Sequence, residues 1–377
     1  VAAYPRNHIL EHSYLNPGAE FPWIYSADRA STEIIDTSNL QVMNRIFYGA
    51  EDMDIGDVVS DDDVELVYGS GTIVHYDELG ATLLHDYSWT EQTTAVELVD
   101  MDADPHLEIL KGTINQLSTP GGPMEAYNSG DPAPFHVWPT IAHPVGAWDI
   151  FGDETLEIVG IGVDSSVNVI DTESLNIIWT YPPPTEPRNT AFGDTDGDGE
   201  IEMVLGFKDD MHIVDVATKT NEWQSAPVIG GPFSPVAVGD LGNNGSLELV
   251  FASQNDVGFE AIEGSWLIVM DAHTHEEHHR SQLPLAVGGL LHEASNIEIG
   301  DVDGDAKPEI VVTGHDDSWD ENAYVMILDG ETFAVEYEYL ASSTIKPKSL
   351  RIADVDDDSQ SELVFGSPDT TSTHRIW

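Results

Sequence analysis

The chain has 377 residues, of which 69 are acidic and 13 are basic, so its formal net charge at pH 7 is −56. This balance leaves no basic stripe for nucleic acid, cysteine is absent, and no run of about 18 apolar residues could span a membrane. So large a charge repels itself in dilute buffer and is screened in concentrated salt, which favours a protein that works in high salt. The alternative is an acidic, calcium-rich secreted protein from an ordinary fluid.

The N-terminal segment, residues 1–30, contains several prolines and no clear period, so we predict an extended arm before one domain over residues 31–377. Residues 32–43 closely parallel residues 167–178, and both segments predict the hairpin of the last two strands of a sheet. The final repeat ends at Trp377 without an outer strand. We therefore expect residues 40–47 to supply that strand and to close the domain.

An acidic loop recurs along the rest of the chain, with acids at positions 1, 3, 5 and 9 and an apolar run directly after them. An oxygen at every second residue can wrap a hard cation such as Ca²⁺, which is bound by many oxygen ligands. An EF-hand differs, because its last acid comes later in the loop and helices flank it. The four copies with every carboxylate in place are Asp100, Asp102, Asp104, Glu108; Asp194, Asp196, Asp198, Glu202; Asp301, Asp303, Asp305, Glu309; and Asp354, Asp356, Asp358, Glu362.

Three further copies lack the acid at position 3. The copy of Asp240, Asn244 and Glu248 has Gly242 there and is still expected to bind metal. The other two, Asp57, Asp61, Glu65 and Asp149, Asp153, Glu157, have Val59 and Phe151 there and are expected to keep the turn but to bind metal poorly or not at all. The first acids recur every 40 to 60 residues or so, with several short strands in each repeat, which predicts an all-β, seven-bladed β-propeller of four-stranded antiparallel blades. Eight blades remain an alternative.

With their flanking glycines and apolar residues, these loops resemble FG-GAP/VCBS repeats over about residues 40–377. Such repeats form the calcium-bearing blades of integrin α-subunit propellers, of many secreted microbial surface proteins and of some polysaccharide lyases. The resemblance implies several Ca²⁺ ions and an extracellular or cell-surface location, but no single activity, because one blade type serves many functions. Position 6 departs from the pattern, since glycine stands there only at Gly199 and Gly245, and Pro105, Ala306 and Ser359 replace it elsewhere.

Long connections predict a binding surface on the face opposite the acidic loops, because loops on a rigid scaffold carry function. They lie near residues 112–135, 253–264 and 314–322. The predicted contact residues are His136, Trp138, His143, His315, Trp319 and Asp320. The alternative is that these loops only cover one another.

Two other motifs have bland alternatives. His273, His275, His278 and His279 would suit Zn²⁺ or Cu²⁺, but their place at a predicted hairpin tip favours ordinary polar residues. Asn244-Gly245-Ser246 fits a glycosylation acceptor, yet the same asparagine lies in an acidic loop, where a ligand role is favoured.

The sequence contains no nucleophile elbow, phosphate-binding loop or zincin motif, so we lean towards a protein without catalytic activity. We expect an extracellular, calcium-stabilised module that binds surface glycan or protein in a high-salt environment. One alternative is a structural or decoration subunit of a surface filament, S-layer or halophilic virus particle. Another is a calcium-dependent polysaccharide lyase that would use His136, His143 or His315.

Overall fold

The structure is a computed structural model. It describes residues 9–13, 23–27, 32–36, 41–46, 53–59, 65–77, 80–87, 89, 94–102, 106–113, 122–185, 187, 189–207, 210–225, 233–253, 266–283, 292–316, 323–341, 349–353, 362–366 and 375–376. Every regular element among them is a β-strand. None of these residues belongs to a helix with the length and apolarity needed to cross a bilayer.

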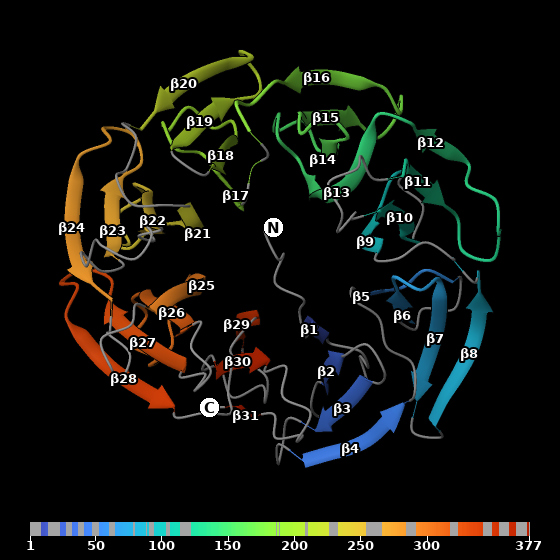
Figure 1. Ribbon diagram of the computed structural model, residues 1–377, viewed down its shortest axis with the longest axis horizontal. Helices are drawn as coiled ribbons and strands as arrows, with labels where there is room; N and C mark the ends of the chain where they lie inside the picture. The colour runs from blue at the N-terminus through green and yellow to red at the C-terminus, as the bar shows by residue number, and fades with distance from the viewer. Residues whose placement is uncertain are drawn as a thin grey trace. The chain divides into compact units, whose positions relative to one another are not determined.

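The chain forms two compact units, of which the first comprises most of residues 1–184 and the second most of residues 185–377. Figure 1 labels the strands. The strands of the first unit are β1 (Ile9–Ser13), β2 (Trp23–Ala27), β3 (Thr32–Asp36), β4 (Gln41–Ile46), β5 (Met53–Gly56), β6 (Glu65–Tyr68), β7 (Thr72–Asp77), β8 (Gly80–Asp86), β9 (Thr94–Val99), β10 (Glu108–Thr113), β11 (Met124–Tyr127), β12 (His136–Trp138), β13 (Ile141–Trp148), β14 (Glu157–Gly162), β15 (Val167–Asp171) and β16 (Ile177–Tyr181). They form four sheets, each made of four consecutive antiparallel strands.

The second unit repeats this arrangement, as its strand labels in Figure 1 show. Its strands are β17 (Asn189–Gly193), β18 (Glu202–Gly206), β19 (Met211–Asp215), β20 (Thr220–Gln224), β21 (Phe233–Gly239), β22 (Glu248–Ser253), β23 (Trp266–Asp271), β24 (Glu277–Gln282), β25 (His292–Gly300), β26 (Glu309–Asp316), β27 (Ala323–Asp329), β28 (Val335–Ala341), β29 (Ser349–Ala353), β30 (Glu362–Gly366) and β31 (Arg375–Ile376). The first three sheets have four strands each, and the described part of the last sheet has three.

The N-terminal segment differs from its prediction. β1 and β2 pair with each other and β2 pairs with β3, so residues 9–13 and 23–27 are strands of a sheet and not parts of an extended arm. The predicted hairpin of β3 and β4 is confirmed. The number of blades was predicted from the number of acidic loops. This sheet was missed because the connection between β1 and β2, residues 14–22, carries no acidic motif. The described residues therefore form eight sheets, and the count of seven blades is not confirmed.

The proposed closure by residues 40–47 is not observed either. β4 pairs with β3 in the first sheet, and the strands described in the last sheet are β29, β30 and β31. The reason is that β1 and β2 complete the first sheet, so β4 serves as its fourth strand.

Burial explains why the second and third strands are apolar. All described positions of β18 and β19 are buried, whereas most of β20 is exposed. Within each unit the first strands of consecutive sheets lie side by side, for example β17 with β21 and β21 with β25, so the core lies between the sheets. A Cβ atom on Gly239 would lie 2.9 Å from Ile299, so a glycine before the first acid allows this close approach.

The sheet of β25–β28 shows where the acidic loop lies within a sheet. The acidic loop joins its first and second strands, and a hairpin turn joins its third and fourth. Because neighbouring strands are antiparallel, the acidic loop and the hairpin turn lie at the same edge of the sheet.

Candidate metal centres in the acidic loops

We name each acidic loop by the number of its first acid. In loop 194, between β17 and β18, Asp194 accepts hydrogen bonds from the N–H of Gly197 at 2.7 Å and of Gly199 at 3.0 Å. Asp301 does the same in loop 301, with Gly304 at 2.8 Å and Ala306 at 2.9 Å. The first acid therefore orders the loop backbone in addition to any role as a metal ligand.

The acids at positions 3 and 5 also hold the backbone. Asp196 accepts from the N–H of Asp198 at 3.0 Å, and Asp198 accepts from the N–H of Glu200 at 2.8 Å. The corresponding bonds in loop 301 run from Asp305 to Asp303 at 3.0 Å and from Lys307 to Asp305 at 2.8 Å. Such local side-chain bonds stabilise turns and hold successive carboxylates in a regular arrangement.

Backbone geometry explains which residues stand at positions 4 and 6. Both positions have positive φ in the fully described loops, with values of 82° and 94° at Gly197 and Gly199 and of 81° and 65° at Gly304 and Ala306. Glycine adopts this conformation without steric cost, whereas alanine does not. Ala306 is thus a strained departure from the loop pattern.

The acid at position 9 has a role that the sequence analysis missed. In five loops its Oε2 atom accepts a hydrogen bond from the backbone N–H of position 2. The pairs are Glu65 with Val58, Glu108 with Met101, Glu202 with Thr195, Glu248 with Leu241, and Glu309 with Val302. All five glutamates are buried. The constant spacing of seven residues between position 2 and the glutamate was the sequence signal that could have revealed this bond. The bond links the two ends of the loop.

Three loops bring carboxylates together in a way that fits a cation. Oxygen atoms of Asp100, Asp102 and Glu108 lie within 4.8 Å of one another, as do those of Asp194, Asp196 and Glu202 and those of Asp301, Asp303 and Glu309. These are hard oxygen donors of the kind that Ca²⁺ prefers. The donor set therefore fits the predicted ion, while the binding itself stays a prediction.

Burial and the neighbouring acids change the titration of these glutamates. Burial, followed by the charges of nearby acids, raises the pKa of Glu202 and of Glu309 to about 7. The pKa of Glu248 is raised as well, again chiefly by burial. A bound cation would favour the ionised form of each carboxylate and oppose this shift.

Parts of the predicted metal set lie outside the described residues. These are Asp104 and all three aspartates of loop 354, Asp354, Asp356 and Asp358, and Asp61 of the degenerate loop 57 also lies outside them. Glu362 begins β30, but its side chain is outside the description. Loop 240 keeps the turn, since Asp240 accepts from the N–H of Asn244 at 2.9 Å and of Gly245 at 2.6 Å. Glu248 closes this loop, so the three predicted ligands share one loop.

Loop 149 keeps the turn, as expected for a degenerate copy. Asp149 accepts from the N–H of Asp153 at 2.9 Å and of Glu154 at 3.0 Å. Glu157 begins β14 and is buried. Whether this loop binds metal is not tested.

Loop 57 carries histidine beside its acids. The Nδ1 atom of His75 lies 3.5 Å from the Oε1 atom of Glu65, and that of His106 lies 3.7 Å from the Oδ1 atom of Asp57. His75 is the residue paired with Glu65 across β6 and β7. At this register position four other sheets carry an aspartate, namely Asp171, Asp215, Asp271 and Asp329. At this register position loop 57 thus has an imidazole where loops 194 and 301 have a carboxylate, and the second imidazole, His106, comes from loop 100.

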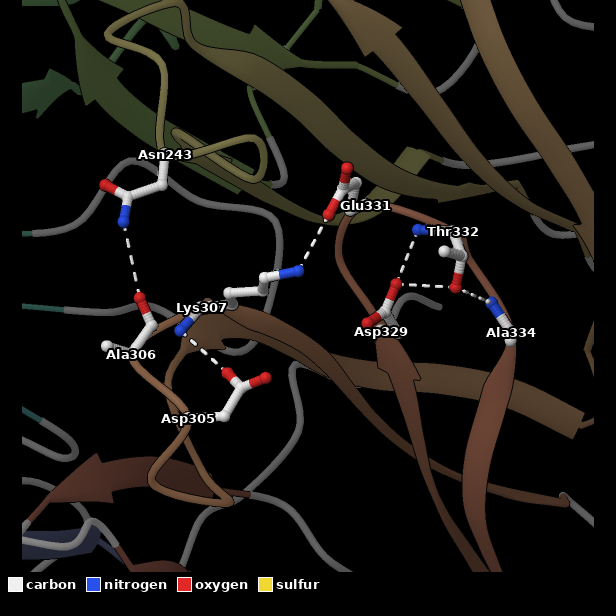
Figure 2. Close-up of polar contacts among 8 residues, drawn as sticks. All are labelled: Asn243, Asp305, Ala306, Lys307, Asp329, Glu331, Thr332 and Ala334. Carbon is white, nitrogen blue, oxygen red and sulfur yellow. Dashed lines mark hydrogen bonds and ion pairs between the residues drawn. The ribbon is translucent and has the colours of Figure 1, made fainter.

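Two contacts tie loop 301 to its neighbours, and Figure 2 shows both. Lys307 donates through Nζ to Glu331 at 2.8 Å, which joins the loop to the hairpin turn between β27 and β28. Asp329, the last residue of β27, accepts from the N–H and the hydroxyl of Thr332 in that turn, both at 2.5 Å, and these bonds lower its pKa. Asn243 of loop 240 donates to the Ala306 carbonyl at 3.3 Å, so two consecutive acidic loops are in contact.

Three of the predicted contact residues, His136, Trp138 and His143, lie in the part of the chain whose side chains the structure describes. Trp138 is only 3% exposed, and its indole N–H donates to the Leu175 carbonyl at 2.9 Å. It packs between two sheets, so its assignment to a binding face was wrong, because β12 turns this side chain inward. The ring of His136 lies 4.4 Å from that of Trp138. His143 lies at a bulge in β13, close to Gly112.

The other contact predictions are not tested. His315 belongs to β26, but its side chain is outside the description, and Trp319 and Asp320 lie outside the described residues altogether.

The histidine cluster is used for packing. His275 follows the third strand of its sheet and stacks on Trp223 with ring centroids 4.5 Å apart, and His279 stacks on Phe333 at 4.7 Å. Burial lowers the pKa of both histidines. The predicted place at a hairpin turn is confirmed, and the contacts favour the bland alternative over a transition-metal site.

No protein-family profile matches the chain, and comparison with characterised proteins finds no significant sequence relative. The structure is similar to the V. cholerae biofilm matrix protein Bap1, with a TM-score of 0.57 and 12% identity over 98% of this chain and 86% of that one. It is similar to BamB from Moraxella catarrhalis (0.54, 12%, 96% of each chain) and to Saccharomyces cerevisiae Sqt1 (0.52, 10%, 78% of each chain). BamB and Sqt1 are β-propeller proteins. The chain has a β-propeller fold. At these identities the likeness concerns the fold alone.

Proposed function

We propose that this chain is an extracellular β-propeller of the FG-GAP/VCBS type whose acidic loops bind Ca²⁺ and so stabilise a module that binds surface glycan or protein. The observation that carries the calcium proposal is the approach of three carboxylates within 4.8 Å in each of three loops. Each of the eight sheets would serve as one blade.

The residues of each acidic loop would both hold the ion and order the loop backbone. The acids at positions 1, 3 and 9 would hold the ion, and the same side chains order the loop by accepting its backbone N–H groups. When bound, the ion would supply positive charge that offsets the repulsion among these acids. Because the glutamate at position 9 is the first residue of the second strand, the ion would also fix the spacing of the first two strands of its blade.

The high-salt part of the proposal rests on the net charge of −56. At about 1 M salt the Debye length is near 3 Å, against about 10 Å at 0.1 M, so neighbouring surface acids are screened only at the higher concentration. An extracellular location follows from the need for calcium, and the fold likeness to a biofilm matrix protein is compatible with it.

Glycan-array binding in molar NaCl tests the binding function. The full chain should bind a subset of surface glycans in excess calcium and lose that binding in EGTA. A variant shortened within residues 114–121 serves to locate the contact on the face of the long connections. Absence of binding together with assembly into filaments or sheets would support a structural subunit instead. Release of unsaturated sugar from an acidic glycan would support a lyase.

A further inference from the structure

Asn244 and Gly245 of loop 240 form the one Asn-Gly dipeptide in the sequence. Both residues are exposed in the structure. An asparagine side chain can be attacked by the backbone nitrogen of the following residue, and glycine leaves that nitrogen open because it has no side chain. The attack releases ammonia and forms a cyclic imide, which is one reason why asparagine is a thermolabile residue.

Loop 240 places a hydrogen-bond acceptor and a donor beside the two reacting groups. The N–H of Gly245, which carries the attacking nitrogen, donates to Oδ2 of Asp240 at 2.6 Å. The Oδ1 atom of Asn244, on the carbon under attack, accepts from the N–H of Ser246 at 2.8 Å. A carboxylate in this place accepts the proton of the attacking nitrogen, and the donor stabilises the negative charge that develops on Oδ1.

Two glycines leave space around the asparagine. Gly245 has a φ of 85°, and a Cβ atom there would meet no atom of the described residues within 4 Å. A Cβ atom on Gly242, at position 3, would lie 2.6 Å from Nδ2 of Asn244, so the glycine leaves room beside the nitrogen that departs. Loops 194 and 301 have Asp196 and Asp303 at that position.

We propose that Asn244 is a self-modification site, at which loop 240 promotes deamidation of the side chain to aspartate. The Gly245 nitrogen bonds to Cγ of Asn244 and passes its proton to Asp240, and this proton leaves with the amide group as ammonia. Water then adds hydroxyl to Cγ and hydrogen to the Gly245 nitrogen, and the bond between these two atoms breaks. The Ser246 N–H polarises Cγ through Oδ1, which favours aspartate over the isoaspartate that attack on the backbone carbonyl would give.

The product matches the complete loops. Asp198 and Asp305 stand at the same position 5, and each accepts the N–H two residues later at 2.8 Å, as Asn244 does. Aspartate would therefore keep the bond that the asparagine makes. The effect on calcium rests on the proposed function. There a carboxylate replaces an amide among the predicted ligands of loop 240, so the modified loop binds the ion more tightly.

Peptide mapping by mass spectrometry tests the modification on the full chain, incubated at mildly alkaline pH in molar NaCl and EGTA. Asn244 should convert faster in the folded chain than in the same chain unfolded by urea. Asn128 is exposed and precedes a serine, so it reports the background rate in the same sample. Aspartate should be the main product at Asn244, and isoaspartate as the main product would overturn the proposed route.

Two matched variants test the role of the acceptor. Asp240→Asn removes the group that takes the proton and should slow the conversion of Asn244 by about tenfold or more. The control Asp149→Asn removes the same charge from the first position of loop 149, where Asp149 accepts the equivalent N–H groups, and should leave the rate unchanged. An unchanged rate in Asp240→Asn, or faster conversion in urea than in the folded chain, would overturn the proposal.

Calorimetric titration with CaCl₂ separates the modification from the calcium function. Asn244→Asp reproduces the product, and one of its sites should bind calcium about tenfold more tightly than in freshly purified wild type. The control Asn128→Asp adds the same charge outside the acidic loops and should match wild type. Equal affinities in all three proteins would overturn the effect on calcium. Absence of calcium binding in all three would overturn the calcium function, whereas the modification is decided by the mapping alone.

Discussion

Glu202 accepts a hydrogen bond from the backbone N–H of Thr195 at 2.6 Å, and this bond joins the first residue of β18 to the second residue of loop 194. The same bond closes loop 57, although that loop lacks the acid at position 3. The position-9 glutamate therefore has a structural role that does not require metal, and the aspartates before it distinguish a complete loop from a degenerate one.

Substitution of Glu65 separates these roles. Glu65→Ala should destabilise the protein by about 1 to 3 kcal/mol, because the buried N–H of Val58 loses its acceptor, and the loss should be the same with and without calcium. Glu65→Gln keeps an acceptor oxygen and serves as the control. Urea unfolding in calcium and in EGTA measures the difference. A loss that appears only in calcium would show that loop 57 is a metal site after all.

The stability of the calcium-free protein should fall as pH rises from 4.5 to about 7. The pKa of Glu202 and of Glu309 is raised from 4.5 to about 7 in the folded state, so each group contributes stability at low pH that is lost as pH rises through the folded value. Calcium should reverse this trend, since it binds the ionised carboxylates. Melting temperatures across this pH range, in EGTA and in calcium, test both slopes.

The control for this pH dependence is Glu202→Gln/Glu309→Gln, in which neither side chain titrates. Its calcium-free slope should be flatter than that of wild type. An identical slope would assign the pH dependence to the remaining surface acids.

Loop backbone strain predicts opposite effects for two substitutions at position 6. Gly199 has a φ of 94°, and a Cβ atom there would meet nothing within 4 Å, so Gly199→Ala should cost about 1 kcal/mol through conformation alone. Ala306 has a φ of 65°, so Ala306→Gly should be neutral or should stabilise by up to about 1 kcal/mol. Denaturant midpoints in saturating calcium measure both. Destabilisation by both changes would contradict the strain account.

Trp138 should act as a core residue. Trp138→Ala should destabilise by about 3 to 5 kcal/mol, because it removes a buried side chain that packs between two sheets. Trp138→Phe keeps an aromatic ring but removes the donor to Leu175, and it should cost roughly 1 kcal/mol. Equilibrium unfolding measures both variants. An unchanged stability in Trp138→Ala would show that Trp138 is not a core residue and would support its predicted role as a surface contact.

The sequence predicted the features that repeat along the chain. It did not predict the features that lie outside the repeat pattern. The apolar runs after Glu202 and Glu309 predicted buried second strands, and the aspartate spacing predicted loops whose carboxylates converge. The sheet that contains β1 and β2 was missed because the connection between these strands lacks the acidic motif. Trp138 was misplaced because the inward side of a three-residue strand is set by its neighbours and not by its own pattern. The pairing of His75 with Glu65 depends on strand register, which a single sequence does not reveal.

The central claim is that the acidic loops bind calcium and that the folded protein depends on it. Thermal unfolding of the full chain in constant molar NaCl, with saturating CaCl₂ and then with EGTA, tests this claim most directly. At a free calcium concentration of one hundred times the Kd, each site stabilises the folded protein by about 2.7 kcal/mol. The convergent loops 100, 194 and 301 therefore predict a large fall in melting temperature on chelation, and added calcium should restore the original value. An unchanged melting temperature in EGTA would contradict the account.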